Sequence, residues 1–157
     1  MRKRITTNGS EDASLEPHKW LDVAQLAVVE VTSEDPSHPI ESALVAGGSG
    51  GWRAAGPGRQ TIRLVFDEPQ TIRRIYLAFQ ETDRPRTQEF VLRWRGANDN
   101  HDREIARQQY NFSPSGSTRE IEDYRVNLVG AASLELMIVP DISGGEARAS
   151  LQRMLLE

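Results

Sequence analysis

Hydrophobic and polar residues alternate along most of the chain after residue 60. In "TIRLVF", Ile62, Leu64 and Phe66 fall on one side, and "EFVLRWRG" repeats the pattern with Phe90 and Leu92. Successive side chains of a strand point to opposite faces, so this period of two predicts half-buried strands. Eight segments have strand character: residues 28–31, 61–66, 71–79, 89–96, 103–112, 119–128, 133–140 and 147–157.

Turn-forming residues separate these segments at intervals of roughly ten residues, which is typical of an antiparallel β-sandwich. The sequence therefore predicts an all-β jelly roll. One short helix is expected within residues 38–48, where Ile40, Ala43 and Leu44 share a face and Gly47 ends the helix. A shift of phase near Arg73 predicts a bulge or bend in the strand at 71–79.

The chain divides into a short tail and one domain. Residues 1–17 contain few large apolar side chains and predict a flexible N-terminal tail. Residues 18–157 predict a single β-sandwich binding domain.

Composition excludes several classes of chemistry. The sequence has no cysteine, which excludes disulfides, thiolate metal sites and thiol catalysis. No signal peptide and no apolar stretch of membrane-spanning length is visible, so a cytoplasmic protein without a membrane partner is expected.

The charge of the chain argues against nucleic acid as a partner. The net charge is −4, which provides no general attraction to phosphate backbones. Nearly all basic residues are arginine, with Lys3 and Lys19 the only lysines. Arginine suits planar contacts with carboxylates and phosphates, but genomic base composition explains the bias equally well.

The sequence does not support a known catalytic motif, either because the motif is missing or because the elements around it are in the wrong order. Gly47–Gly51 fits the G-x-S-x-G pattern of a serine nucleophile, but a helix precedes it and a strand follows, which reverses the required order. The chain has no Gly-Lys-Ser/Thr phosphate loop and no G-x-G-x-x-G. A flexible turn explains the glycines, and an anion-binding nest of backbone amides is the alternative.

No metal site or cofactor is expected. The histidines at 18, 38 and 101 lie far apart in the sequence, without the spacing of zinc ligands. Asn98, Asn100 and Asp102 alternate as in a calcium loop, but the glycine and glutamate of such a loop are missing. Neighbouring carboxylates on a strand point to opposite faces, so the sequence predicts a protein that is not an enzyme.

Residues 39–79 resemble the first half of the galactose-binding-like β-sandwich superfamily, of the discoidin or coagulation factor 5/8 type C kind. "GGSGGWRAAGPGRQTIRLVF" carries the glycine loop, the tryptophan and the strand that follows, and the resemblance extends over about residues 22–157. It implies a non-catalytic module with Trp52 in the core. The acidic segment with which many relatives bind calcium reads Ala46–Gly50 here and has no carboxylate.

The resemblance implies that loops at one end of the sandwich, at 46–60, 81–88 and 110–118, hold a carbohydrate or another small polar ligand. The candidate ligand-binding residues are Arg53, Arg84, Arg86, Gln88, Tyr110 and Phe112. Solvated loop charges explain the arginines equally well, and packing explains the two aromatic residues.

A narrower similarity concerns "GWRAAGPGRQTIRLV", which resembles the N-terminal domain of a single-strand-break repair scaffold of the same fold. It implies an alternative role as an intracellular scaffold or assembly domain that binds protein or nucleic acid.

Overall fold

Strands and the turns that join them make up most of the chain that the structure describes. The computed structural model describes residues 20–157, so the tail predicted for residues 1–17 lies outside the described residues. None of the helices in this part of the chain has the length and apolar character needed to cross a bilayer. In chain order the elements are α2 (Val23–Leu26), β1 (Ala27–Val31), η2 (Ile40–Ala43), β2 (Trp52–Pro57), β3 (Gln60–Gln80), β4 (Arg86–Gly96), β5 (Arg103–Phe112), β6 (Arg119–Val139), β7 (Arg148–Leu151) and β8 (Arg153–Leu156).

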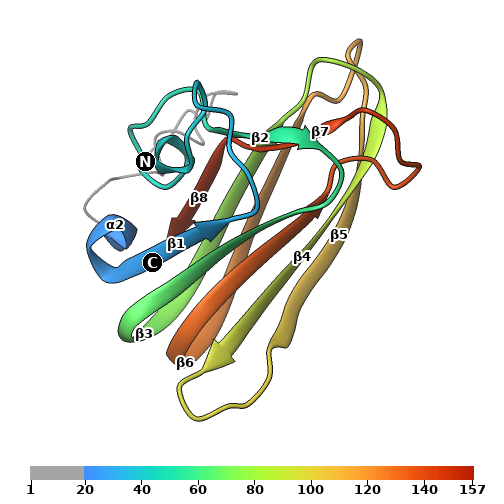
Figure 1. Cartoon of the computed structure of the whole chain (residues 1–157). Coiled ribbons are helices and arrows are strands. Elements are labelled where there is room, and N and C mark those ends of the chain that lie inside the picture. Colours follow the sequence, from blue (N-terminus) through green and yellow to red (C-terminus); the bar gives the residue numbers. More distant parts are fainter. Residues whose placement is uncertain (1–19) are drawn as a thin grey trace, which may run out of the picture.

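The strands form two antiparallel layers because β3 and β6 each belong to both (Figure 1). Residues 60–65 of β3 pair with residues 133–138 of β6, and β1, β4 and β5 complete this layer. Residues 72–80 of β3 pair with residues 119–128 of β6, and β8 pairs with the same part of β3. The antiparallel β-sandwich predicted from the sequence is confirmed.

β3 and β6 bend together where they pass from one layer to the other. The register of β3 shifts between Val65 and Gln70 and again between Ile72 and Arg74, which confirms the bulge predicted there. The sequence predicts two strands with a turn at residues 67–70, whereas the structure keeps them as one strand. The ladder to β6 continues past the bend, and Gly130 in β6 adopts a φ of 67° there.

The predicted helix within residues 38–48 is reduced to the single 3₁₀ turn η2. Ile40 and Ala43 are its buried residues, and a 3₁₀ turn places positions three apart on the same face. The structure adds one four-residue α-helix, α2, which the sequence analysis did not predict.

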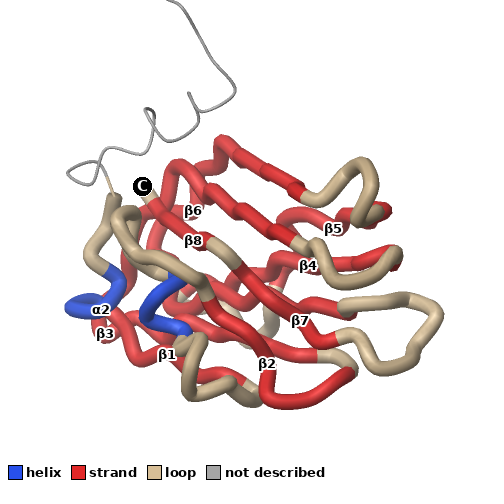
Figure 2. Tube along the Cα trace, turned by 90° about the horizontal axis from the view of Figure 1, so that it is seen from above, coloured by secondary structure: helices blue, strands red, loops and turns tan. Residues whose placement is uncertain are grey.

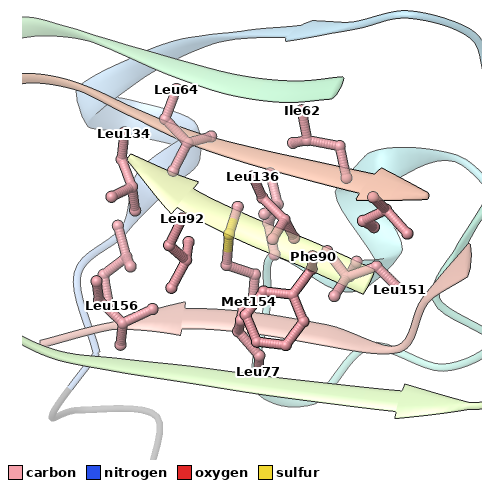
Figure 3. Packing of buried hydrophobic residues seen from close by; sticks show 14 of the residues in the cluster. Ile62, Leu64, Leu77, Phe90, Leu92, Leu134, Leu136, Leu151, Met154 and Leu156 are labelled. Carbon is pink, nitrogen blue, oxygen red and sulfur yellow. The ribbon is translucent and has the colours of Figure 1, made fainter. Parts of the chain in front are cut away.

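The core lies between the two layers. Alternate residues of β3 and β6 point inward, and Leu64, Leu134 and Leu136 are at most 1% exposed. Figure 3 shows side chains from both layers meeting, with Met154 of β8 close to Leu77 and Phe90. Trp52 is 1% exposed, so its predicted place in the core is confirmed.

β2 and β7 form a separate two-stranded ribbon, in which Trp52 pairs with Leu151 and Arg53 pairs with Ser150. Figure 2 shows the two strands side by side, with β7 continuing toward β8. Between β7 and β8, the amide of Gln152 donates to the carbonyl oxygen of Ala78 in β3 at 2.9 Å. The ribbon is thereby fixed next to the C-terminal end of β3.

Candidate functional site

A polar hollow of about 340 Å³ lies where β2, β7 and the end of β3 meet. Trp52 and Leu151 contribute to its wall, as does the backbone of Gly50. The polar side chains that line it are His38, Arg53, Gln80, Thr82, Ser150 and Gln152.

Two glycines allow β2 to start close against β7. Gly50 and Gly51 have φ values of 84° and 65°, a region that side chains disfavour. A Cβ on Gly51 would lie 2.5 Å from the carbonyl oxygen of Leu151 and 2.8 Å from the Cα of Gln152. The glycine loop singled out in the sequence therefore has a structural role: it seats the strand that carries Arg53.

Arg53 is held firmly by its backbone, while its guanidinium is uncommitted. Its amide donates to the carbonyl oxygen of His38 at 3.2 Å, and its own carbonyl oxygen accepts from the amide of Asp35 at 2.8 Å. Its strand neighbours Trp52 and Ala54 are buried in the core, so Arg53 lies on the other face of β2. No hydrogen bond or ion pair within residues 20–157 engages its guanidinium.

Two other polar atoms at the hollow lack a hydrogen-bond partner among the described residues. They are Nδ1 of His38 and Oε1 of Gln152, both buried. The imidazole lies near the carboxylate of Asp35, with 3.6 Å between Nδ1 and Oδ2, which is too long for a good hydrogen bond. Because both atoms are buried, the groups of the hollow that are open to a ligand are the other polar groups of its lining.

A buried ion pair lies beneath the hollow. Glu81 and Arg86 contact each other, and each side chain is 1% exposed. The hydroxyl of Ser150 donates to the Glu81 carboxylate, and Arg86 donates to the carbonyl oxygen of Arg148 at 3.1 Å. Burial raises the pKa of Glu81 and lowers that of Arg86, in both cases because water no longer solvates the charge. The network fixes Ser150, which is also part of the lining of the hollow.

Of the six ligand-binding residues predicted from the sequence, Arg53 is the one that lines the hollow. Arg84 is exposed in the loop before β4 and pairs with Asp83, with 3.3 Å between Nε and Oδ2. Arg86 is buried in the ion pair described above. Gly50, Trp52 and Arg53 of the 46–60 loop and Thr82 of the 81–88 loop line the hollow, whereas no residue of 110–118 does.

The other three predicted residues point into or against the sandwich. Gln88 is 1% exposed and its amide lies 3.4 Å from Oε1 of Glu120. Phe112 is 2% exposed, and its ring centroid lies 4.8 Å from that of Tyr110. The Tyr110 hydroxyl donates to the carbonyl oxygen of Arg119 at 2.9 Å. These side chains contribute to packing in this structure.

Sequence reasoning did not identify five of the polar residues that line the hollow: His38, Gln80, Thr82, Ser150 and Gln152. They come from segments more than one hundred residues apart, which only the fold brings together. No local motif marks them. A weak signal exists for Ser150 and Gln152, which are uncharged polar residues on either side of Leu151 in the C-terminal segment.

No group of three or more His, Asp or Glu side chains within residues 20–157 is arranged to hold a metal ion. The hollow itself has no carboxylate in its lining. The hollow therefore offers hydrogen-bonding side chains and one guanidinium, that of Arg53, which has no hydrogen bond or ion pair within residues 20–157.

The two antiparallel layers, the long strands shared between them and the ribbon at one end define a galactose-binding-like β-sandwich. Comparison with solved structures supports this fold. A family 32 carbohydrate-binding module from a family 31 glycoside hydrolase of Clostridium perfringens aligns with a TM-score of 0.61 at 18% identity, over 97% of this chain and 98% of that chain.

Two further structures of the same kind are similar. The family 32 module of NanJ from C. perfringens, in complex with galactose, has a TM-score of 0.60 and 12% identity, over 83% of this chain and 92% of that one. The family 32 module of AlyQ, in complex with 4,5-unsaturated mannuronic acid, has a TM-score of 0.58 and 19% identity, over 84% and 95%. At these identities the likeness concerns the fold. No protein-family description and no curated protein matches the sequence.

Proposed function

We propose that this chain is a non-catalytic carbohydrate-binding module that holds a sugar in the hollow between β2, β7 and the end of β3. The observation that carries the proposal is the lining of that hollow, in which the guanidinium of Arg53, without a hydrogen bond or ion pair inside residues 20–157, lies beside the hydrogen-bonding side chains of Gln80 and Thr82. The fold supports it, because the similar structures are described as carbohydrate-binding modules.

The size and chemistry of the hollow suit a single sugar ring. A volume of about 340 Å³ lies at the lower end of the range for small-molecule pockets. Sugar hydroxyls both donate and accept hydrogen bonds, and Gln80, Thr82, Ser150 and Gln152 offer both kinds of group.

Hydrogen bonds, rather than ring stacking, account for the expected affinity. Trp52, the aromatic residue in the wall, is 1% exposed and offers no open platform. About four hydrogen bonds at a net ~1 kcal/mol each correspond to a Kd on the order of 1 mM.

The lining argues for binding without catalysis. Most glycoside hydrolases use two carboxylates that flank the bond to be broken. The hollow has none in its lining, and the nearby Glu81 is buried and paired with Arg86. We therefore expect a bound sugar to dissociate from the hollow without having been hydrolysed.

A glycan array followed by NMR titration of the ¹⁵N-labelled protein tests the proposal. We expect shifts of the backbone amides of Arg53, Gln80 and Gln152 with a sugar found on the array. Gln152→Ala should weaken that binding about five-fold, because it removes one hydrogen-bonding group worth ~1 kcal/mol. Arg84→Ala is the matched control and should bind like the parent, because Arg84 does not line the hollow.

Absence of sugar binding, or shifts confined to other faces of the molecule, contradicts the proposal. The alternative role as a protein or nucleic-acid scaffold stays a prediction. It gains support if the chain isolates a stable protein or DNA partner and binds no glycan.

A further inference from the structure

The electrostatic character of the hollow differs from that of the whole chain. The protein carries a net charge of −4, yet the lining contains one arginine, one histidine and no carboxylate. The nearest acidic groups are already engaged: Glu81 with Arg86 and Ser150, and Asp35 with the amide of Ser37 at 2.9 Å.

Three arginines that are partly or fully buried in the sandwich contact a carboxylate, whereas Arg53, Arg93 and Arg95 have no such contact within residues 20–157, and of these three only Arg53 lines the hollow. Arg63 lies 3.5 Å from a carboxylate oxygen of Glu135, and Arg74 lies 2.8 Å from one of Asp123. Arg86 contacts Glu81. Arg53, which is also partly buried, has no such carboxylate partner within residues 20–157. The carboxylate of Glu81 acts on Arg53 electrostatically but is already in contact with Arg86, so two guanidiniums share one carboxylate. An anionic ligand at Arg53 would balance the second positive charge.

From these two observations we infer that the hollow takes a sugar that carries a carboxylate, a uronic acid, and that the guanidinium of Arg53 binds this carboxylate. The inference rests on the proposed function and names the ligand class of the same site. A planar guanidinium matches a carboxylate through two parallel hydrogen bonds. The backbone bonds of Arg53 to the 35–38 segment hold its strand in place before a ligand arrives.

The neutral groups favour a sugar acid over an inorganic anion. One arginine balances one negative charge, whereas phosphate sites normally combine several basic groups or a helix N-terminus. The remaining side chains, Gln80, Thr82, Ser150 and Gln152, suit the hydroxyls of a sugar ring. The carboxylate would lie at Arg53 and the ring hydroxyls along β7 and the end of β3.

Pairs of sugars that differ only in one group provide the test. In each pair the acid carries a carboxylate where the neutral sugar carries a hydroxymethyl group. The pairs are galactose and galacturonate, glucose and glucuronate, and mannose and mannuronate. We expect isothermal titration calorimetry to show at least one acid binding about ten-fold more tightly than its neutral counterpart, because a charge-assisted hydrogen bond adds about 1.5 kcal/mol or more. The affinity for the acid should fall as NaCl rises from 50 to 500 mM, and that for the neutral sugar should not.

Variants at position 53 identify the group responsible. Arg53→Gln should remove the preference for the acid, and Arg53→Lys should keep part of it because the charge remains without the planar fork. Arg84→Gln is the matched control and should keep the full preference. Thermal melts of each variant verify that it is folded. If Arg53→Gln does not fold, Arg53→Lys is used in its place to test the preference for the acid.

The outcomes separate the two proposals. If the neutral sugars bind in the hollow as tightly as their acids, or if Arg53→Gln keeps the preference, the inference is overturned while the sugar-binding function stands. If inorganic phosphate displaces the acid at equal concentration, the claim that a sugar acid is favoured over an inorganic anion is overturned. If neither member of any pair binds and no glycan is found, the proposed function itself fails.

Discussion

The pairing of Glu81 with Arg86 places two charges where almost no water reaches them. Removing charges from water costs several kcal/mol each, and only close contact with further hydrogen bonds offsets this cost. Here Ser150 donates to Glu81, and Arg86 donates to the carbonyl oxygen of Arg148. The pair therefore ties residues 81–86 to β7 at Arg148 and Ser150, and Ser150 lines the hollow.

Replacing one partner of this pair should be strongly destabilising. Arg86→Met leaves the carboxylate of Glu81 buried without its counter-charge, and we expect the free energy of unfolding at pH 7 to fall by about 3–5 kcal/mol. Urea denaturation followed by tryptophan fluorescence measures this loss. The double variant Arg86→Met/Glu81→Met removes both charges and should recover most of it. A single variant as stable as the parent would show that the pair does not support the fold.

The alternation of a strand predicts the burial of single residues when it is extended over the whole length of that strand. Arg86 and Gln88 share the buried face of β4 with Phe90 and Leu92, so extending the alternation by two steps would have placed both inside. The family resemblance instead places both in the predicted ligand-binding loop at 81–88, and the burial of Arg86 and Gln88 differs from what is usual for charged and amide side chains. Arg53 was predicted as a ligand-binding residue and lies in the hollow, but its binding role awaits the experiments above.

At the scale of elements, the join between β2 and β7 depends on close approach of two backbones. Gly51 adopts a positive φ, and its Cα faces the chain at Leu151 and Gln152. Because backbone atoms cannot move aside as a flexible side chain does, any Cβ here must push the two strands apart.

Gly51→Ala should therefore destabilise the ribbon and weaken ligand binding together. We expect a loss of about 2 kcal/mol or more, from the strained φ and the clash combined. Gly47→Ala is the matched control from the same glycine stretch, because nothing lies within 4 Å of its added Cβ and its φ is not positive. Chemical denaturation and the sugar titration report the two effects. Equal stability of both variants would contradict the role given to Gly51.

Elements were predictable from local pattern, whereas their partners were not. Six of the eight strand segments expected from the alternation lie within strands of the structure, segment 133–140 extends one residue past β6, and segment 147–157 is divided between β7 and β8. The sequence could not show that residues 60–80 form one strand shared by two layers, because the pairing partners in β6 lie some 40 to 80 residues further along the chain. For the same reason the hollow, which joins β2 to β7, had no local signal.

At the scale of the whole molecule, the sandwich interior contains a buried pair of polar side chains. Glu120 of β6 and Gln88 of β4 face each other across the two layers, and both are at most 3% exposed. Oε2 of Glu120 and Oε1 of Gln88 have no hydrogen-bond partner among the described residues, and both are acceptors. A proton on the Glu120 carboxyl group supplies the missing donor.

The pH dependence of folding should reveal that proton. Burial, together with the neighbouring carboxylate of Glu122, raises the pKa of Glu120 from 4.5 to about 8. Between these values the folded chain holds a proton that the unfolded chain releases. The contribution to stability is therefore complete below pH 4.5 and is lost as the pH rises toward 8, with a slope of up to about 1.4 kcal/mol per pH unit.

Comparison of the parent with Glu120→Gln isolates this contribution, because glutamine keeps the shape and a donor but does not titrate. We expect urea denaturation at pH 5, 6, 7 and 8 to show the parent losing stability relative to Glu120→Gln at each step. Glu104→Gln, on the exposed side of β5, should change with pH as the parent does. If the difference between the parent and Glu120→Gln stays constant across this range, Glu120 is already ionised in the folded protein. The two facing acceptors must then be satisfied by an ordered water that bridges the two layers.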